Sequence, residues 1–252
     1  MTRLPLLAAV AASALALGCC TEMSFSTGPR ATATEELVVD PGEATALSVT
    51  TSAGNIRVGP CLKERGAMTV LATKSADSEE DLARIHPFAR VEGDTILVGY
   101  TVDPGIEGFG VSFELQPVEV KRASLKTSAG NLRAIGLRGD LVLKTSAGNI
   151  GVEGADGSVD AGTSAGNVSV SGRLRGKCRV ESNAGNLSVS IPGDSRLKVT
   201  GRTSAGNATS DLAVGATRSV ASGAIDGTLG DGSEGTLEMR TSAGNIALKK
   251  LP

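Results

Sequence analysis

Few side chains in this 252-residue sequence are of the types that carry out acid–base, nucleophilic or metal chemistry. His86 is the only histidine, and it stands before Pro87 near the end of an expected helix. A serine–histidine–aspartate arrangement would have to use that one residue, and no nucleophile-elbow motif is present. We therefore expect His86 to lie on the surface or in packing, and we expect no catalytic residue.

The carboxylates do not form a recognisable metal or catalytic pattern. Asp140, Asp156, Asp194 and Asp231 fall in expected turns at irregular spacing, which builds neither a carboxylate pair nor a calcium array. Calcium-binding nonapeptide repeats need a recurring aspartate that this sequence lacks. The formal net charge of −2 is too small to indicate a nucleic-acid partner. We expect no metal, no cofactor and no nucleic acid.

The most regular feature is the motif Thr-Ser-Ala-Gly-Asn, which starts at residue 51 and recurs at 127, 145, 163, 203 and 241. An altered copy occupies Ser182 to Asn186. From asparagine to asparagine the gaps are 76, 18, 18, 19, 21 and 38 residues. They indicate a unit of about 18–21 residues, with 38 close to two units and 76 close to four. We interpret Ala221 to Ile225 as the missing copy in the shorter gap, with Ala224 in the asparagine position.

Apolar and polar residues alternate on both sides of each motif copy, which predicts a half-buried strand before it and another after it. Inward positions before the motif are Leu47, Ala123, Leu141, Val159, Cys178, Val199 and Leu237, and those after it are Ile56, Leu132, Ile150, Val168, Leu187, Ala208 and Ile246. Glycine and asparagine favour a bend between the two strands, because glycine adopts backbone conformations closed to other residues. The expected bend residues are Gly54, Asn55, Gly130, Asn131, Gly148, Asn149, Gly166, Asn167, Gly185, Asn186, Gly206, Asn207, Gly244 and Asn245.

A second set of glycine turns, at Gly136, Gly154 and Gly172, separates the units. One unit cannot bury its apolar face alone, whereas copies stacked about 4.8 Å apart build a continuous core. The sequence therefore predicts an all-β, single-chain β-solenoid, a right-handed parallel β-helix with rungs of about 18–21 residues and a short inserted helix. The alternative is an antiparallel β-sandwich or meander, in which Ala-Gly would be a hairpin turn.

The N-terminus has the pattern of an export signal. Residues 1–18 contain Arg3 and then an apolar run from Leu4 to Leu17 that is too short to span a bilayer as a helix. The run ends in Ala-Leu-Gly before Cys19, which resembles the bacterial lipoprotein signal and implies that Cys19 carries the lipid. The residue after Cys19 is Cys20 rather than an aspartate, which by resemblance to Gram-negative lipoproteins favours the outer membrane. The alternative is an ordinary signal peptide.

Beyond the signal, residues 19–35 are predicted to be a flexible tether and residues 36–252 a β-solenoid repeat domain. Residues 60–122 interrupt the repeat and are interpreted as irregular early rungs with an inserted helix, which starts at the capping residue Ser78. Lysines before the final proline suit the blunting of an exposed terminal strand.

The cysteines allow more than one state. Cys178 occupies an inward position and is expected to be a small buried apolar residue. Cys20 and Cys61 could pair or stay free in an oxidising envelope.

The recurring Thr-Ser-Ala-Gly-Asn followed by Ile, Leu or Val and a short strand resembles the bacterial "putative adhesin" family of β-strand repeat domains, related to the head GIN adhesin domains. The resemblance covers roughly residues 36–250. It implies a β-helical cell-envelope protein and carries no catalytic residues. The lipoprotein-like signal is a departure, since many relatives look secreted or membrane-spanning.

Three functions follow as hypotheses. The first is a non-enzymatic cell-envelope lipoprotein for adhesion or surface interaction, bound to the membrane through its lipid and to a surface glycan or protein ligand. The second is a structural or stress-associated envelope component without a ligand. The third is a polysaccharide-acting β-helix enzyme, although the regular repeats contain no aromatic platform. Phe88, Tyr100, Phe109 and Phe113 lie in 60–122, where they either pack the helix or form a binding surface.

Overall fold

The computed structural model describes residues 31–61, 66–218 and 222–251. The predicted signal peptide 1–18, Cys19, Cys20 and the tether up to residue 30 lie outside the described residues. Residues 31–35, which the sequence assigned to the tether, instead form the start of strand β1 (Ala31–Val39). Their alternation of half-buried and exposed side chains continues into the apolar residues Leu37 and Val39, so the strand begins earlier than expected.

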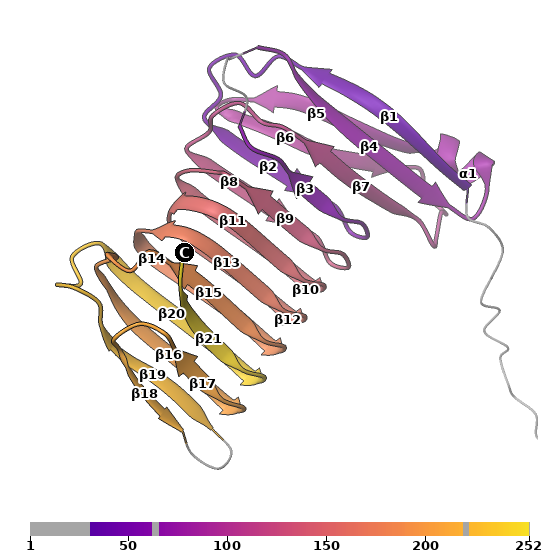
Figure 1. Cartoon of the computed structure of the whole chain (residues 1–252). Helices are drawn as coiled ribbons and strands as arrows, with labels where there is room; N and C mark the ends of the chain where they lie inside the picture. The colour runs from indigo at the N-terminus through magenta and orange to yellow at the C-terminus, as the bar shows by residue number, and fades with distance from the viewer. Residues whose placement is uncertain (1–30, 62–65, 219–221, 252) are drawn as a thin grey trace, which may run out of the picture.

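The described chain is all-β apart from one short helix, and its strands form two large mixed sheets (Figure 1). Sheet A has ten strands in the order β1, β4 (Met68–Ala76), β7 (Gly110–Leu115), β3 (Ile56–Val58), β9 (Leu132–Ile135), β11 (Ile150–Gly157), β13 (Val168–Leu174), β15 (Leu187–Ile191), β21 (Ile246–Lys250) and β17 (Ala208–Ser210). Sheet B has eleven strands in the order β18 (Gly215–Arg218), β19 (Gly223–Thr228), β16 (Leu197–Ala205), β20 (Gly235–Ala243), β14 (Gly176–Ala184), β12 (Val159–Ala165), β10 (Asp140–Ala147), β8 (Arg122–Lys126), β2 (Ala46–Thr50), β6 (Thr95–Val102) and β5 (Ile85–Glu92).

The middle of each sheet is parallel, and equivalent residues of successive copies lie side by side. Leu141 pairs with Val159 in sheet B, and Ile150 pairs with Val168 in sheet A. Each motif copy follows a strand of sheet B and precedes a strand of sheet A. This arrangement is solenoid-like, and the antiparallel alternative describes only the strands at the two ends.

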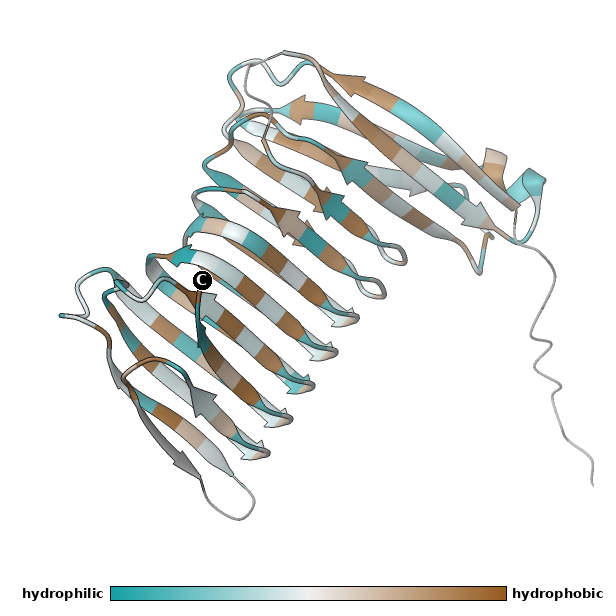
Figure 2. Ribbon diagram, viewed as in Figure 1, coloured by the Kyte–Doolittle hydropathy of each residue, from teal (hydrophilic) through white to brown (hydrophobic). Residues whose placement is uncertain are grey.

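The two sheets share one apolar core, and the predicted inward residues lie in it. Leu141 is 2% exposed, Val159 and Cys178 are fully buried, and Ile150 is 2% exposed. Figure 2 shows the resulting alternation of apolar and polar bands along the central strands. The period-two pattern of the sequence is therefore confirmed as the source of the core.

Residues 60–122 lie between the first two motif copies in the sequence, but they do not lie between them in the structure. Strands β3 and β9, which follow Asn55 and Asn131, pair directly in parallel, so the 76-residue gap does not hold further copies between them. Strand β6 pairs in parallel with β2, and β7 pairs in parallel with β3, so these two strands lie on the outer side of the first copy. Strands β4 and β5 then add antiparallel pairs that close this end of the molecule.

The predicted helix is confirmed as α1 (Glu79–Ala83). Ser78 caps it, and its hydroxyl accepts a hydrogen bond from the Asp81 amide at 3.1 Å, as expected for a serine before an acidic first turn. The helix ends at Ala83, and Ile85 already begins β5, so His86 lies in that strand and not at the helix end.

The last two copies stack in an order that differs from their order in the chain. β20 lies between β14 and β16, and β21 lies between β15 and β17. The missing copy expected at 221–225 is wrong. Residue 221 lies outside the described residues, and Gly223 to Thr228 form β19, which runs antiparallel to β16. The chain's last strand, β21, is not at the edge of its sheet, because Ile246 to Leu248 pair with β17 on one side and with β15 on the other. Lys249 and Lys250 extend beyond β17 and pair with β15 alone.

Within the described ranges, no helix has the length and apolar character needed to cross a membrane.

Candidate functional site

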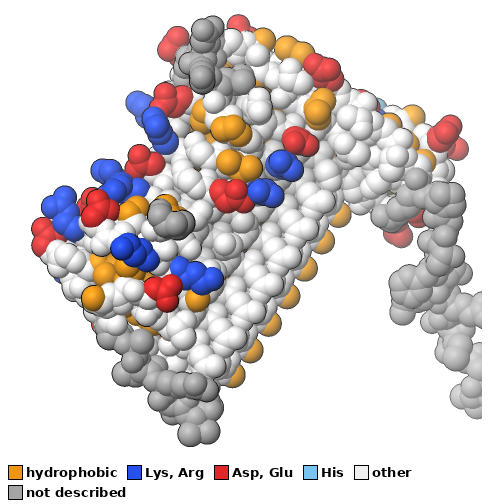
Figure 3. All heavy atoms as spheres, viewed as in Figure 1, with side chains coloured by type: hydrophobic (Ala, Val, Ile, Leu, Met, Phe, Trp, Pro, Cys, Tyr) orange, Lys and Arg blue, Asp and Glu red, His pale blue; other side chains and the backbone are white. Residues whose placement is uncertain are grey.

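The seven motif copies meet along one edge of the molecule, where the chain passes from sheet B to sheet A. In spatial order this edge contains residues 51–55, 127–131, 145–149, 163–167, 182–186, 241–245 and 203–207, and we call it the motif ridge. Figure 3 shows it as a straight, regularly ribbed edge without charged side chains. All the predicted bend residues are therefore brought together.

The first residue of each copy faces the core, and in every copy but the one at Thr51 its hydroxyl donates to the glycine carbonyl of the copy beside it. Thr145 is 6% exposed, and its hydroxyl donates to the Gly130 carbonyl at 3.2 Å. Thr163 donates in the same way to Gly148 at 3.0 Å, and Ser182 donates to Gly166 at 2.9 Å. The hydroxyl provides the glycine carbonyl with a hydrogen-bond donor at the bend, where buried polar groups need a partner.

The glycine is required for close stacking as well as for its backbone conformation. Gly148 has a φ of +149°, and a Cβ built on it would lie 2.0 Å from the carbonyl oxygen of Gly130. That neighbour is backbone and cannot rotate away. A side chain at this position would therefore push adjacent copies apart.

The asparagines form a continuous hydrogen-bonded ladder. The Asn149 amide N–H donates to Asn131 Oδ1 at 2.9 Å, and Asn149 Nδ2 donates to the same oxygen at 3.3 Å. Equivalent backbone bonds join all seven asparagines in the order Asn55, Asn131, Asn149, Asn167, Asn186, Asn245 and Asn207. Sequence reasoning treated asparagine as a bend residue and missed this ladder. The available signal was that asparagine occurs in every one of the seven copies, although the bend itself requires only glycine.

The outer surface of the motif ridge can offer only hydrogen bonds and small apolar contacts. Its serine, alanine and asparagine positions are mostly exposed, and none of them titrates near neutral pH. Such a row can bind through hydroxyl and amide groups at regular intervals, but it holds no acid, base or nucleophile pair.

The charged residues beside the motif ridge are mixed in sign and largely paired. Lys144 Nζ lies 2.5 Å from Asp160 Oδ1, and Arg179 Nε lies 2.7 Å from Glu181 Oε1. The stacking order also places Arg202 directly opposite Arg240, a pairing that sequence spacing did not indicate. This row offers no uniform charge for a repeated ligand.

The candidate chemical residues are dispersed. His86 Nε2 lies 3.6 Å from Asp103 Oδ1, and both side chains are about half exposed. In the described ranges, no three His, Cys, Asp or Glu residues gather into a group that could hold a metal ion. Cys61 and Cys178 are free thiols, and burial raises the pKa of each above its ordinary value.

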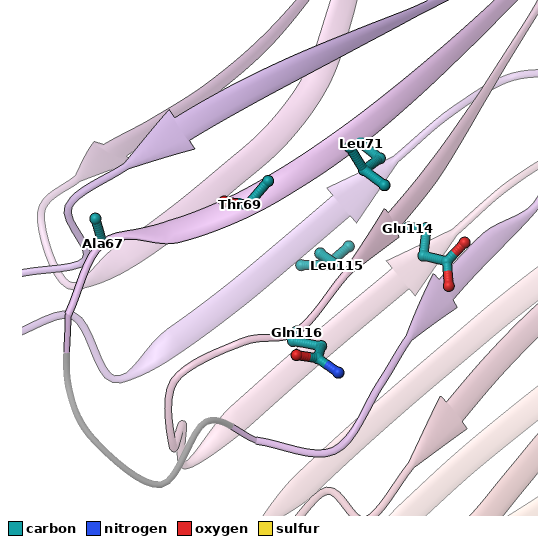
Figure 4. A pocket seen from close by; sticks show the side chains of 6 residues that line it. All are labelled: Ala67, Thr69, Leu71, Glu114, Leu115 and Gln116. Atoms are coloured by element: carbon teal, nitrogen blue, oxygen red, sulfur yellow. The ribbon is translucent and has the colours of Figure 1, made fainter.

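Two shallow hollows lie at the N-terminal end. The first has a volume of about 360 Å³ on sheet A and is shown in Figure 4, where Leu71 and Glu114 project from neighbouring strands near Gln116. The second, about 380 Å³, lies on sheet B beside Phe88 and Tyr100.

The aromatic residues of the irregular section do not pack the helix as a group. Phe113 is buried in the core. Tyr100 and Phe109 meet edge to face with ring centroids 5.6 Å apart. Phe88 lies half-buried on the outer side of sheet B, under the Arg90 guanidinium.

Several solved structures of bacterial proteins are similar to this chain. A "putative cell adhesion protein" from Clostridium sporogenes is 14% identical with a TM-score of 0.46, over 88% of this chain and 100% of that one. A "putative adhesin" from Bacteroides fragilis is 11% identical with a TM-score of 0.43, over 88% and 97%. A "putative lipid binding protein" from Parabacteroides distasonis is 11% identical with a TM-score of 0.31, over 88% and 97%. Likeness at this level carries no argument about function.

No curated protein matches the chain. The family model described as Toastrack DUF4097, in contrast, matches residues 24–249, which is most of the sequence. The protein therefore belongs to the Toastrack DUF4097 family.

Proposed function

We propose that this protein is a non-enzymatic cell-envelope lipoprotein whose β-repeat domain serves adhesion or another surface interaction. In this proposal a lipid on Cys19 holds the chain in the membrane, which is the outer membrane, with the domain on its periplasmic or surface face. The partner is a surface glycan or protein. The central stack is a right-handed parallel β-helix, related to the head GIN adhesin domains.

The observation that supports this proposal is the motif ridge. Seven copies in strict register form a long, straight and uncharged edge. Stacked repeats of this kind create extended surfaces on which a partner can dock without rearrangement of the protein. A catalytic pocket would need convergent titratable groups, whereas the motif ridge offers repeated hydroxyl and amide groups.

The structural alternative, an envelope component without a specific ligand, is supported by a different observation. Threonine, glycine and asparagine of each copy all have internal partners, as Thr145, Gly148 and Asn149 illustrate. The contacts needed for folding are therefore sufficient to explain why the same motif residues recur in every copy. Under this alternative the exposed serines would have no partner outside the chain.

The test compares cells that display the full chain with cells that display a Cys19→Ser variant. Loss of the cysteine should release the protein from the detergent-extractable membrane fraction and abolish lipid labelling. Stable attachment should also require more than one acyl chain, because a single chain anchors only marginally.

Binding is then measured between purified full chain and an array of glycans and matrix proteins, and between displaying cells and host or bacterial surfaces. Saturable binding to a surface ligand supports the adhesion proposal. Normal anchoring without any ligand would favour the structural alternative, and membrane retention of the Cys19→Ser variant with normal lipid labelling would refute the anchor.

A further inference from the structure

The hollow beside Phe88 on the outer face of sheet B combines apolar and hydroxyl groups without a charged lining residue. Its volume of about 380 Å³ lies within the range of small-molecule sites. Phe88, Leu97 and Gly99 provide the apolar side, and Ser48, Thr50 and Ser52 provide the hydroxyl side. We call it the Phe88 hollow.

The Phe88 hollow exists because two paired strands separate. β2 and β6 pair in parallel from Ala46 and Thr95 to Val49 and Val98. Beyond this point β2 turns into the first motif copy, whereas β6 continues along β5 to Val102. The separation opens a space between Thr50 and Gly99. A hollow of similar volume beside Ser182 and Thr241 on the same sheet is lined by Glu181, Arg202 and Arg240 and has no aromatic side chain in its lining.

The Phe88 ring is held in one position. Gly99 is its cross-strand partner, and a Cβ on Gly99 would lie 3.1 Å from Phe88 Cζ, so the ring tip lies over the glycine. On another side the Arg90 guanidinium lies 4.3 Å from the ring centroid. Arg90 in turn pairs with Glu92 on the surface, where Nε donates to Oε1 at 2.6 Å. An aromatic surface that is already ordered loses little entropy when a ligand contacts it.

The opposite side is ordered too. The Tyr100 hydroxyl donates to Ser52 Oγ at 2.8 Å, which fixes both groups at the end of the hollow. The Thr51 side chain turns inward, and its hydroxyl already donates to the Val111 carbonyl at 2.7 Å, so this hydroxyl does not face a ligand in the hollow. The exposed hydroxyls that can meet a ligand are those of Thr50 and Ser52, with the half-buried Ser48 beside them.

We propose that the Phe88 hollow binds one ring of a neutral oligosaccharide. The C–H face of a sugar ring would contact Phe88 and Leu97, and its hydroxyls would bond to Ser48, Thr50 and Ser52. A sugar ring has the same division into an apolar face and a polar rim as this lining. The inference deepens the proposed function, on which it rests for its setting, because it names the ligand class of the surface interaction.

The charges around the hollow favour a neutral ligand over an acidic one. Arg90 is already paired with Glu92, and no carboxylate or ammonium group lines the hollow. A uronate or sulfate held there would lose water without gaining a counter-ion in the lining, which is unfavourable. Lys126 stands beside Thr50 on β8, outside the lining, and therefore provides a direct control.

The experiment measures binding of the purified full chain to oligosaccharides built from neutral hexoses or N-acetylhexosamines, with uronic-acid and sulfated oligosaccharides in parallel. We expect binding to the neutral group. Phe88→Ala should raise Kd at least about tenfold, because it removes the ordered aromatic contact. Thr50→Glu should weaken binding similarly, and as an exposed strand residue it should leave the melting temperature almost unchanged.

Two matched variants should retain wild-type affinity. Lys126→Ser changes the neighbouring charge, and Leu71→Ala changes the hollow on sheet A. Full binding by both Phe88→Ala and Thr50→Glu would overturn the site. Preference for uronic acids that disappears in Lys126→Ser would overturn the ligand class. Cell-surface binding by the wild type without any neutral-glycan binding would refute this inference and leave the proposed function standing. Neutral-glycan binding without cell-surface adhesion would support the ligand site and refute the proposed adhesion.

Discussion

The Gly148→Ala substitution tests whether each bend depends on contact with the bend beside it. Gly148 has a φ of +149°, a region that side chains with a Cβ rarely adopt, and holding alanine there costs on the order of 1–3 kcal/mol. The added Cβ would also lie 2.0 Å from the Gly130 carbonyl oxygen and 2.6 Å from its carbon. Because both partners are backbone, the two copies have to separate.

Separation of the copies would weaken hydrogen bonds on both sides of the glycine. The Thr145 hydroxyl reaches the Gly130 carbonyl at 3.2 Å, and the Asn149 amide reaches Asn131 Oδ1 at 2.9 Å. Two such bonds contribute roughly 1–3 kcal/mol together. Added to the backbone strain, they give an expected loss of about 2–6 kcal/mol in the free energy of unfolding.

Gly154→Ala is the matched control, because Gly154 lies in the same stack but within β11, at the register shift between Val152 and Ala155 and away from the motif ridge. Its φ is +64°, and the nearest atom to an added Cβ is Gly136 Cα at an ordinary 3.7 Å. The control should therefore lose only the cost of a left-handed conformation, about 1–2 kcal/mol.

Urea unfolding followed by far-ultraviolet circular dichroism gives the comparison, and the slopes of the transitions must agree before midpoints are converted to free energies. Equal midpoints for Gly148→Ala and Gly154→Ala would refute the reasoning, since contact between adjacent bends would then contribute nothing.

Three further outcomes are expected. Asn149→Ala should cost about 1–3 kcal/mol, because the Asn149 side chain donates through Nδ2 to Asn131 and accepts the Asn167 amide N–H at Oδ1. Asn207→Ala should cost less, because Asn207 takes part through its backbone N–H, which alanine keeps; equal melting temperatures would contradict the ladder. Ile150→Asn should lower the free energy of unfolding more than either asparagine variant, with a total loss of roughly 3 kcal/mol or more in urea unfolding, because it removes apolar burial and places an amide in the core. A variant as stable as the wild type would contradict that packing. Burial raises the pKa of the Cys178 thiol and lowers its thiolate fraction at neutral pH, so iodoacetamide should label half-buried Cys61 first and Cys178 only in urea; early labelling of Cys178 by mass spectrometry would contradict its burial.

In the motif ridge, the residues that hold the stack together differ from those that remain for the proposed surface interaction. Its inward threonines, glycines and ladder amides hold the stack together, which leaves the serines and the outer sides of the asparagines for any partner. Substitutions at the serines therefore separate binding from folding. Substitutions at glycine or threonine would change both.

Local spacing determined much of the fold. The alternation around Leu141 and Ile150 predicted strands on both sides of the bend, since a side chain turns to the opposite face at every residue of a strand. Ser78 before three acidic residues predicted α1, because an N-cap acts within one turn. The bend residues were predicted as well, but only as separate turns.

Tertiary structure decided which copies become neighbours. All copies present nearly the same motif, so local sequence cannot specify that Asn55 stacks on Asn131 across 76 residues or that Asn245 lies between Asn186 and Asn207. Parallel stacking also leaves open strand edges, and antiparallel strands such as β5 and β19 cover the two ends through contacts between distant segments. The Phe88 hollow has the same origin, because β2 and β6 separate only where a strand without the motif stacks on a strand that has it.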